Sequence, residues 1–140
     1  MNERKMKELT VNATAENIPV VTDFVNEQLE EQGCSVKVRT QIDIAIDELF
    51  GNIVQYAYRP ETGTATVRVE LTEDPLAVVI TFIDNGEPYD PLKKDDPDTA
   101  LSAEDREIGG LGIYMVKKSM DGISYEYKNG QNILSIKKRI

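Results

Sequence analysis

The chain has 140 residues, 40% apolar and 29% charged, which is the composition of an ordinary globular protein with room for one hydrophobic core. Its net charge of −9 argues against nonspecific binding to nucleic acid or to an anionic membrane, because attraction to phosphate needs clustered Lys and Arg. A single cysteine, Cys34, and the absence of histidine exclude an internal disulfide, imidazole general bases and zinc sites that use histidine.

Neither a secretory leader nor a membrane span is expected. The chain begins with charged residues that no apolar stretch follows, and no apolar run reaches the ~18 residues that a spanning helix needs. The expected location is therefore the cytoplasm. With no internal repeat and no linker, residues 1–140 are expected to form one domain.

The first half of the chain predicts one strand and two helices. The strand covers residues 6–13, and the first helix follows with Thr14 or Asn17 as its N-cap and Gly33 just beyond its end. The second helix runs from about Ser35 to Ala57, because apolar residues recur there at steps of three and four. The residues of this inward stripe are Ile42, Ala45, Ile46, Leu49, Ile53 and Tyr56.

The second half alternates strands, one long polar segment and a helix. Strands are expected at residues 64–71 and 76–83, a helix at 112–120, and a final hairpin at 123–127 and 133–138. Residues 88–109 have no periodicity, and a segment of that length predicts a mobile cover over a site. This order predicts an α+β two-layer sandwich, with helices on one face of a mixed, mostly antiparallel sheet.

Two polar motifs lie beside the predicted core. Glu48 and Asn52 are four residues apart on the second helix, so their side chains can converge on one point, although such a pair alone favours a solvated helix face. Asp84-Asn85-Gly86 ends a strand, and alone it favours a turn. As a site, the Asp84 carboxylate would accept a hydrogen bond from an exocyclic amine such as that of adenine, while Gly86 would let the backbone approach a flat ring.

A third motif, Gly109-Gly110-Leu111-Gly112, opens the last predicted helix. Backbone N–H groups at a helix N-terminus lie at the positive end of the helix dipole, where phosphate binds. The motif is not a Walker sequence, because no Gly-Lys-Ser or Gly-Lys-Thr occurs in the chain. Alone, a glycine-rich loop is weak support for a site.

Together and in this order, the three motifs resemble the N, G1 and G2 boxes of the superfamily of gyrase, heat-shock chaperone, histidine kinase and MutL ATPases. The fold of that superfamily is the Bergerat α/β sandwich, and the predicted order of elements is the one that this fold requires. The runs Gly86 to Pro91 and Gly110 to Asp121 are similar to the anti-sigma factor serine/threonine kinases.

The resemblance implies an ATP site with Mg²⁺. Asn52 would give its carboxamide oxygen to the metal ion. Glu48 would be the catalytic residue that orients or deprotonates the hydroxyl group of a substrate serine or threonine. Asp84 would bind the adenine amine, and Gly86 would allow the base to approach. Gly110, Leu111 and Gly112 would close the lid at about residues 88–109 and present N–H groups to the phosphates. Arg106 would also contact the phosphates, and a surface salt bridge is the alternative for this residue.

The resemblance also implies a function. The protein would be an ATP-dependent serine/threonine kinase that sequesters a sigma factor, phosphorylates a small antagonist protein and forms a homodimer, with no direct contact to nucleic acid or membrane. Two alternatives remain open from the residues themselves. One is a nucleotide-gated protein-binding module without catalysis, and the other is an interaction domain without a nucleotide site.

Overall fold

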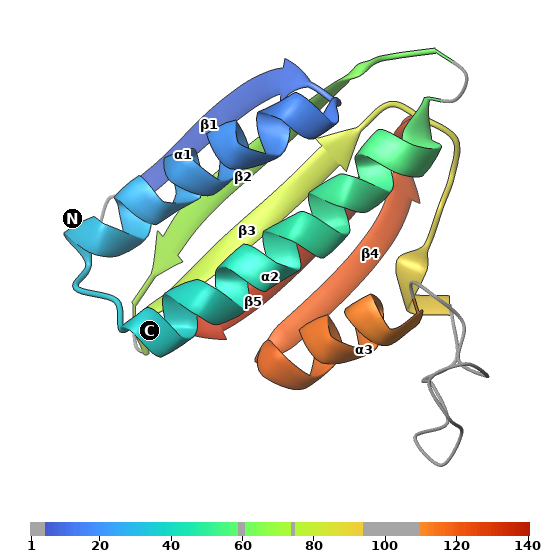
Figure 1. Cartoon of the computed structure of the whole chain (residues 1–140). Coiled ribbons are helices and arrows are strands. Elements are labelled where there is room, and N and C mark those ends of the chain that lie inside the picture. Colours follow the sequence, from blue (N-terminus) through green and yellow to red (C-terminus); the bar gives the residue numbers. More distant parts are fainter. Residues whose placement is uncertain (1–4, 59–60, 74, 94–109) are drawn as a thin grey trace.

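The computed structural model describes residues 5–58, 61–73, 75–93 and 110–140, and these form one sheet covered by three helices (Figure 1). The helices and strands follow the predicted order. Their bounds are β1 Lys5–Asn12, α1 Ile18–Glu31, α2 Val36–Asn52, β2 Thr64–Thr72, β3 Ala77–Asp84, α3 Gly110–Ser119, β4 Gly122–Lys128 and β5 Gln131–Arg139.

The five strands form a single open sheet in the order β1-β2-β3-β5-β4, and each of these pairings is antiparallel. The predicted sandwich with helices on one face is confirmed, and the sheet is antiparallel throughout its described strands where a mixed sheet was expected (Figure 1). The β3–β5 pairing places Asp84 directly opposite Asn132, at the end of the sheet where α2 finishes.

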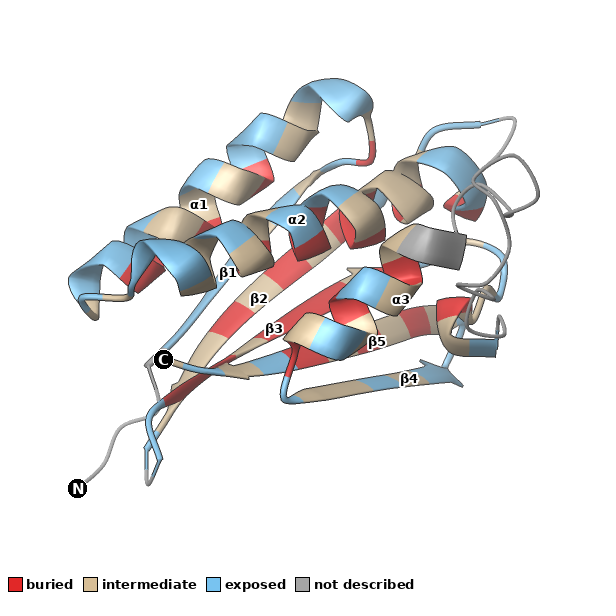
Figure 2. Cartoon of the chain, turned by 60° about the horizontal axis from the view of Figure 1, so that its bottom comes forward, coloured by how far each residue is buried: buried red, intermediate tan, exposed pale blue. Residues whose placement is uncertain are grey.

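The hydrophobic core lies between the sheet and the three helices, as the red residues of Figure 2 show. On β2, burial alternates, with Ala65, Val67 and Val69 turned toward the helices. The helices supply the other half of the core, and Phe50 of α2 and Val25 of α1 are fully buried. Strand and helix periodicities thus bury matching faces, which fixes the register of the whole sheet.

Local signals set the helix ends. The Ser35 side chain accepts a hydrogen bond from the Val38 N–H at 3.2 Å and caps α2. Gly33 has a φ of +67°, the left-handed conformation that glycine adopts readily after a helix. The first helix begins with a 3₁₀ turn at Ala15–Asn17, and Asn17 donates its side-chain hydrogen bond to the Asn12 carbonyl instead of capping α1.

The second helix does not continue as a regular α-helix to Ala57. It changes at Asn52 into a π-helix over Ile53–Ala57, whose wider turn rotates the following side chains relative to the α-helical stripe. Tyr56 was predicted to face the core, and this prediction is wrong, because the ring is 42% exposed. Ala57, which is 5% exposed, takes the buried position.

The segment predicted to be a lid is described only at its beginning. Residues 88–93 lead into a 3₁₀ turn at Pro91–Lys93, and the predicted lid from residue 94 to residue 109 lies outside the described residues. Within the described ranges, no helix combines the length and the apolar character that crossing a membrane requires.

Substitution of Val25 by Ala should destabilise the protein by about 2 to 3 kcal/mol, because two fully buried methyl groups are lost and a cavity remains. Val20→Ala on the same helix is the matched control, since Val20 is 44% exposed and the change in helix propensity is identical. Urea unfolding of both variants measures the difference. Equal unfolding free energies would contradict the assignment of this α1 face to the core.

Candidate functional site

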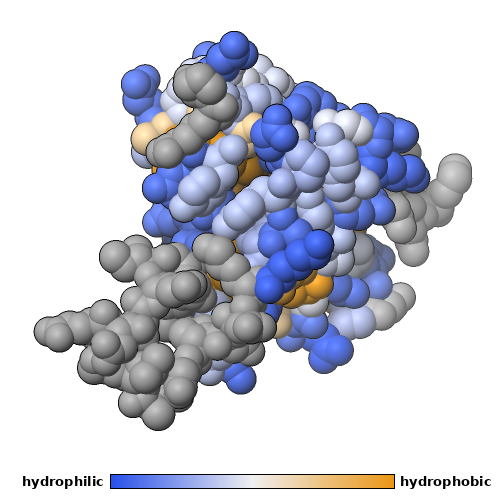
Figure 3. All heavy atoms as spheres, turned by 90° about the vertical axis from the view of Figure 1, so that its right-hand side faces the viewer, coloured by the Kyte–Doolittle hydropathy of each residue, from blue (hydrophilic) through white to orange (hydrophobic). Residues whose placement is uncertain are grey.

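A cavity opens at the end of the sheet where α2 meets β3 and β5. It encloses about 420 Å³, part of it open to solvent, and its walls are mainly apolar and aromatic. Figure 3 shows this end of the molecule, where small hydrophobic areas are visible on a mainly hydrophilic surface. The lining residues are Leu49, Asn52, Ile53, Tyr56, Ala57, Phe82, Asp84, Glu87, Tyr89, Pro91, Tyr125, Asn132 and Leu134.

Asp84 is the buried charged residue of this cavity. It is the last residue of β3 and is only 5% exposed. The Gly86 N–H and the Asn132 side-chain Nδ2 both donate to its Oδ1 atom, each at 2.9 Å. Burial raises the pKa of this carboxyl group, and the two hydrogen bonds lower it in part. The carboxylate is thus held in place on one oxygen while the residue lines an apolar cavity.

Gly86 allows the loop after β3 to lie directly on the end of the second helix. A Cβ atom at this position would lie 2.2 Å from the Ala57 carbonyl oxygen, which no real side chain tolerates. The same carbonyl accepts the Glu87 N–H at 2.9 Å. The glycine is therefore required by the close approach of two backbone segments, in addition to any role beside a ligand.

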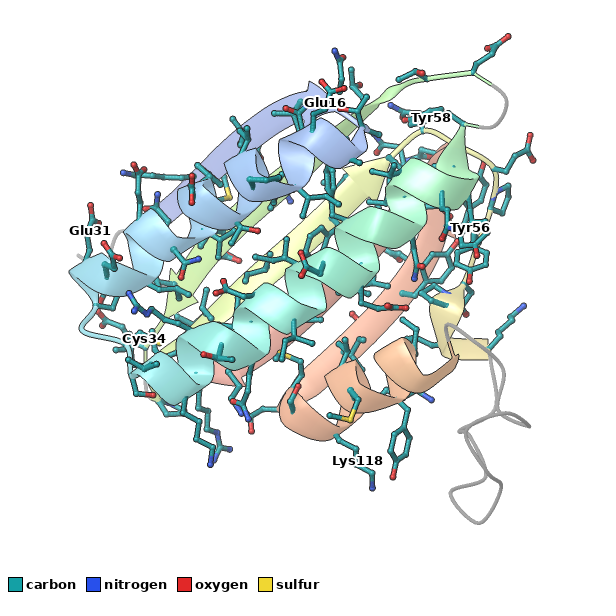
Figure 4. The ribbon with its side chains drawn as sticks, viewed as in Figure 1. Glu16, Glu31, Cys34, Tyr56, Tyr58 and Lys118 are labelled. Carbon is teal, nitrogen blue, oxygen red and sulfur yellow. The ribbon has the colours of Figure 1, made fainter. Side chains whose placement is uncertain are left out.

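Tyr58 joins the same two segments with its hydroxyl group. The hydroxyl donates to the Thr64 carbonyl at 2.6 Å and accepts the Asn85 N–H at 2.8 Å. Figure 4 shows Tyr58 and Tyr56 together at this end of the molecule. Tyr56 stacks on Tyr89 with ring centroids 5.2 Å apart, which places an aromatic pair at the cavity.

Asn132 was not predicted from the sequence, although it lies at the centre of the site. Its side chain is 6% exposed and contacts Asp84, the backbone of residues 86–89 and the Tyr125 hydroxyl group. A signal for it does exist in the chain. Asn132 lies on the same core-facing side of β5 as Leu134 and Ile136, because alternate residues of a strand face the same side. A polar residue at such a position requires a buried partner.

Glu48 and Asn52 lie on the α2 face that looks toward the cavity and α3. The Glu48 carboxylate rests against the first turn of α3, where a Cβ atom on Gly112 would lie 2.2 Å from its Oε2. Gly112 thus provides room for a carboxylate beside the helix N-terminus. Among the described residues, the buried Nδ2 of Asn52 has no hydrogen-bond partner.

The structure brings five predicted residues to one end of the molecule, namely Glu48, Asn52, Asp84, Gly86 and Gly112. Gly110 is the first residue of α3, and Leu111 belongs to the same turn. Arg106 lies outside the described residues, so its predicted phosphate contact stays a prediction. The catalytic, base-binding and metal-binding roles of all these residues also stay predictions.

The residues present fit an adenine nucleotide with a divalent cation. A mainly apolar cavity with one buried carboxylate in its lining suits a base that carries an exocyclic amine. The buried Nδ2 of Asn52 needs a hydrogen-bond acceptor, which a phosphate oxygen would supply, because a buried donor left without one costs about 1 to 3 kcal/mol. The Oδ1 atom of the same side chain is an oxygen ligand of the type that Mg²⁺ prefers.

Comparison with known proteins identifies the class. Residues 11–138 match the model of the histidine kinase-like ATPase domain, and the chain belongs to that family. Within the family the chain is similar to two named serine kinases. It is 30% identical to serine-protein kinase RsbW of Bacillus cereus over 98% of this chain and 88% of that protein, and 30% identical to serine/threonine-protein kinase BtrW of Bordetella bronchiseptica over 73% and 71%. The predicted family resemblance is confirmed.

A solved structure shares the fold. The crystal structure of the RsbU and RsbW domains of Rv1364c from Mycobacterium tuberculosis superposes with a TM-score of 0.68 at 19% identity, over 96% of this chain and 32% of that chain. At this identity the likeness shows the fold alone. It agrees with the sandwich of three helices on a five-stranded sheet described above.

Gly86→Ala should lower the free energy of unfolding by about 1 to 3 kcal/mol, because the new methyl group meets the Ala57 backbone. Gly51→Ala is the matched control, since no atom outside its own helix lies within 4 Å of the added Cβ and alanine favours the helix by about 0.5 to 1 kcal/mol. The thermal unfolding midpoint should therefore fall in the Gly86→Ala variant and rise in the Gly51→Ala variant. A Gly86 variant as stable as the wild type would refute the close approach.

Asp84→Asn should raise the stability of the protein at neutral pH. Because the pKa of Asp84 is raised by burial, the wild type loses stability as the pH rises from the ordinary value near 3.8 through the raised value. The amide retains an oxygen that accepts both hydrogen bonds but carries no charge. Denaturant unfolding across this pH range should show a gain near pH 7 that disappears at low pH. A gain independent of pH would contradict this account.

Proposed function

We propose that the protein is an ATP-dependent serine/threonine protein kinase whose nucleotide base occupies the cavity around Asp84. The observation that carries the proposal is the Asp84 carboxylate, buried and held by two N–H donors in a mainly apolar cavity. Membership of the histidine kinase-like ATPase family supports ATP as the ligand. The two relatives named as serine kinases support serine and threonine as acceptors.

In this proposal each residue has one task. When bound, ATP would be the phosphoryl donor, and Mg²⁺ would offset the negative charge of its phosphates. Asn52 gives its carboxamide oxygen to the metal ion, and Asp84 accepts the hydrogen bond of the adenine amine. Glu48 receives the proton of the substrate hydroxyl group as a positioned general base. Gly112 leaves the space that this carboxylate needs beside α3.

The proposed partners are a sigma factor, which the protein sequesters, and a small antagonist protein that carries the serine acceptor. A homodimer belongs to the same proposal. Residues 1–140 would act as one catalytic domain whose lid at about 88–109 covers the nucleotide. The support for these partners is the likeness to the RsbW and BtrW kinases together with the family motifs in the sequence.

The nucleotide site is tested by calorimetric titration with ATP, with and without Mg²⁺. Binding should require Mg²⁺, and both Asp84→Asn and Asn52→Ala should weaken it by about 10- to 100-fold, the effect of losing a hydrogen bond or ligand to a charged group. If the protein binds no ATP at millimolar concentration in either condition, the chain is an interaction domain without a nucleotide site.

Phosphoryl transfer is tested with labelled ATP and a candidate antagonist protein. Glu48→Gln should lower the rate at least ~100-fold while ATP affinity is retained, because only the proton acceptor is lost. Asp47→Asn is the matched control, since Asp47 is the exposed neighbour on α2 and is not among the residues that line the cavity. A wild-type rate in the Glu48 variant would remove its role as base, and ATP binding without any transfer would favour a nucleotide-gated binding module.

A further inference from the structure

The side chain of Asn132 uses every hydrogen-bonding position that it has. Its Nδ2 donates to Asp84 Oδ1 at 2.9 Å and to the Glu87 carbonyl at 2.8 Å, with the Gly86 carbonyl at the 3.5 Å limit. Its Oδ1 accepts the Tyr89 N–H at 3.0 Å and the Tyr125 hydroxyl group. An asparagine amide has two donors and two acceptor lone pairs, so this amide is saturated.

These partners also fix the orientation of the amide. A rotation of 180° would place Oδ1 against the carboxylate of Asp84 and the carbonyl of Glu87, and Nδ2 against the N–H of Tyr89. Both exchanges replace attraction by repulsion. Asn132 therefore always presents a donor to Asp84, and a saturated amide has nothing left with which to bind a ligand directly.

We propose that Asn132 is a positioning residue for base selection, which keeps Asp84 an acceptor so that the site takes a 6-amino purine and rejects a 6-oxo purine. The inference rests on the proposed ATP site and adds a residue that acts through Asp84. An ionised carboxylate attracts the amine of adenine and repels the carbonyl oxygen that hypoxanthine or guanine has at the same position. A protonated carboxyl group would instead donate to that carbonyl.

The need for such a residue follows from the burial of Asp84. An apolar environment favours the neutral acid, and the N–H donors of Asn132 and Gly86 oppose this by stabilising the ionised form. The other titratable groups that face this carboxylate are the Tyr58 and Tyr125 hydroxyl groups, while Glu87 lines the same cavity. Among the described residues, both hydrogen bonds to Asp84 end on Oδ1, so Oδ2 accepts none of them.

Two nearly isosteric variants, Asn132→Thr and Asn132→Val, test the proposal. Asp84 and Asn132 are directly opposed in the sheet, so a threonine hydroxyl can donate to the same carboxylate, whereas valine has no donor. Threonine and valine both favour strands. Thermal unfolding of the two variant proteins verifies that both fold. Calorimetry with ATP and with inosine triphosphate, each with Mg²⁺ across a range of pH, gives the base preference.

The Thr variant should keep the wild-type preference for ATP, and the Val variant should lose about 10- to 100-fold of it. As the pH falls, the Val variant should also lose half of its ATP binding at a higher pH than the Thr variant does, because its Asp84 carboxylate has lost a donor. If the wild type prefers ATP and the two variants show equal base preferences and equal pH profiles, the role of Asn132 is overturned. The proposed ATP site would stand in that case. A wild type that binds neither nucleotide would overturn the proposed function and this inference with it.

Discussion

The buried carboxylate of Asp84 is the constraint on which this end of the molecule depends. A charge removed from water is costly unless donors compensate it, and the donors here come from its own loop and from the neighbouring strand. The antiparallel pairing of β3 with β5 places Asn132 opposite Asp84, so the sheet register itself supplies one donor. A slip of β5 by one residue would turn Asn132 to the other face of the sheet, away from Asp84.

The second helix supplies the remaining parts of the site through a change in its own geometry. Glu48 and Asn52 lie in its last regular turns, and the π-helix begins directly after Asn52. The wider turn keeps Ala57 against the sheet and presents its carbonyl to the Glu87 N–H. The loop after β3 is therefore fastened to α2 by backbone contacts, and Gly86 is the residue that permits them.

The periodicity of the sequence was sufficient for the order of elements, because strands and helices bury their faces with distinct periods. Asp84 and Gly86 were marked by the order of the three motifs along the chain, because the residues Asp84-Asn85-Gly86 alone favour a turn. Asn132 was missed because its partners are distant in sequence and only the sheet register brings them together. The exposure of Tyr56 was missed because steps of three and four residues continue through Ile53, and the composition of Ile53–Ala57 gives no sign of a π-turn.

The aromatic lining of the cavity has an optical consequence. The chain has six tyrosines and no tryptophan, so tyrosine emission is not lost by energy transfer to an indole ring. Three of the six, Tyr56, Tyr89 and Tyr125, line the cavity, and the first two are stacked. Half of the tyrosines that contribute to the ultraviolet fluorescence of the unlabelled protein therefore line the cavity, and the protein contains its own spectroscopic reporter of what enters it.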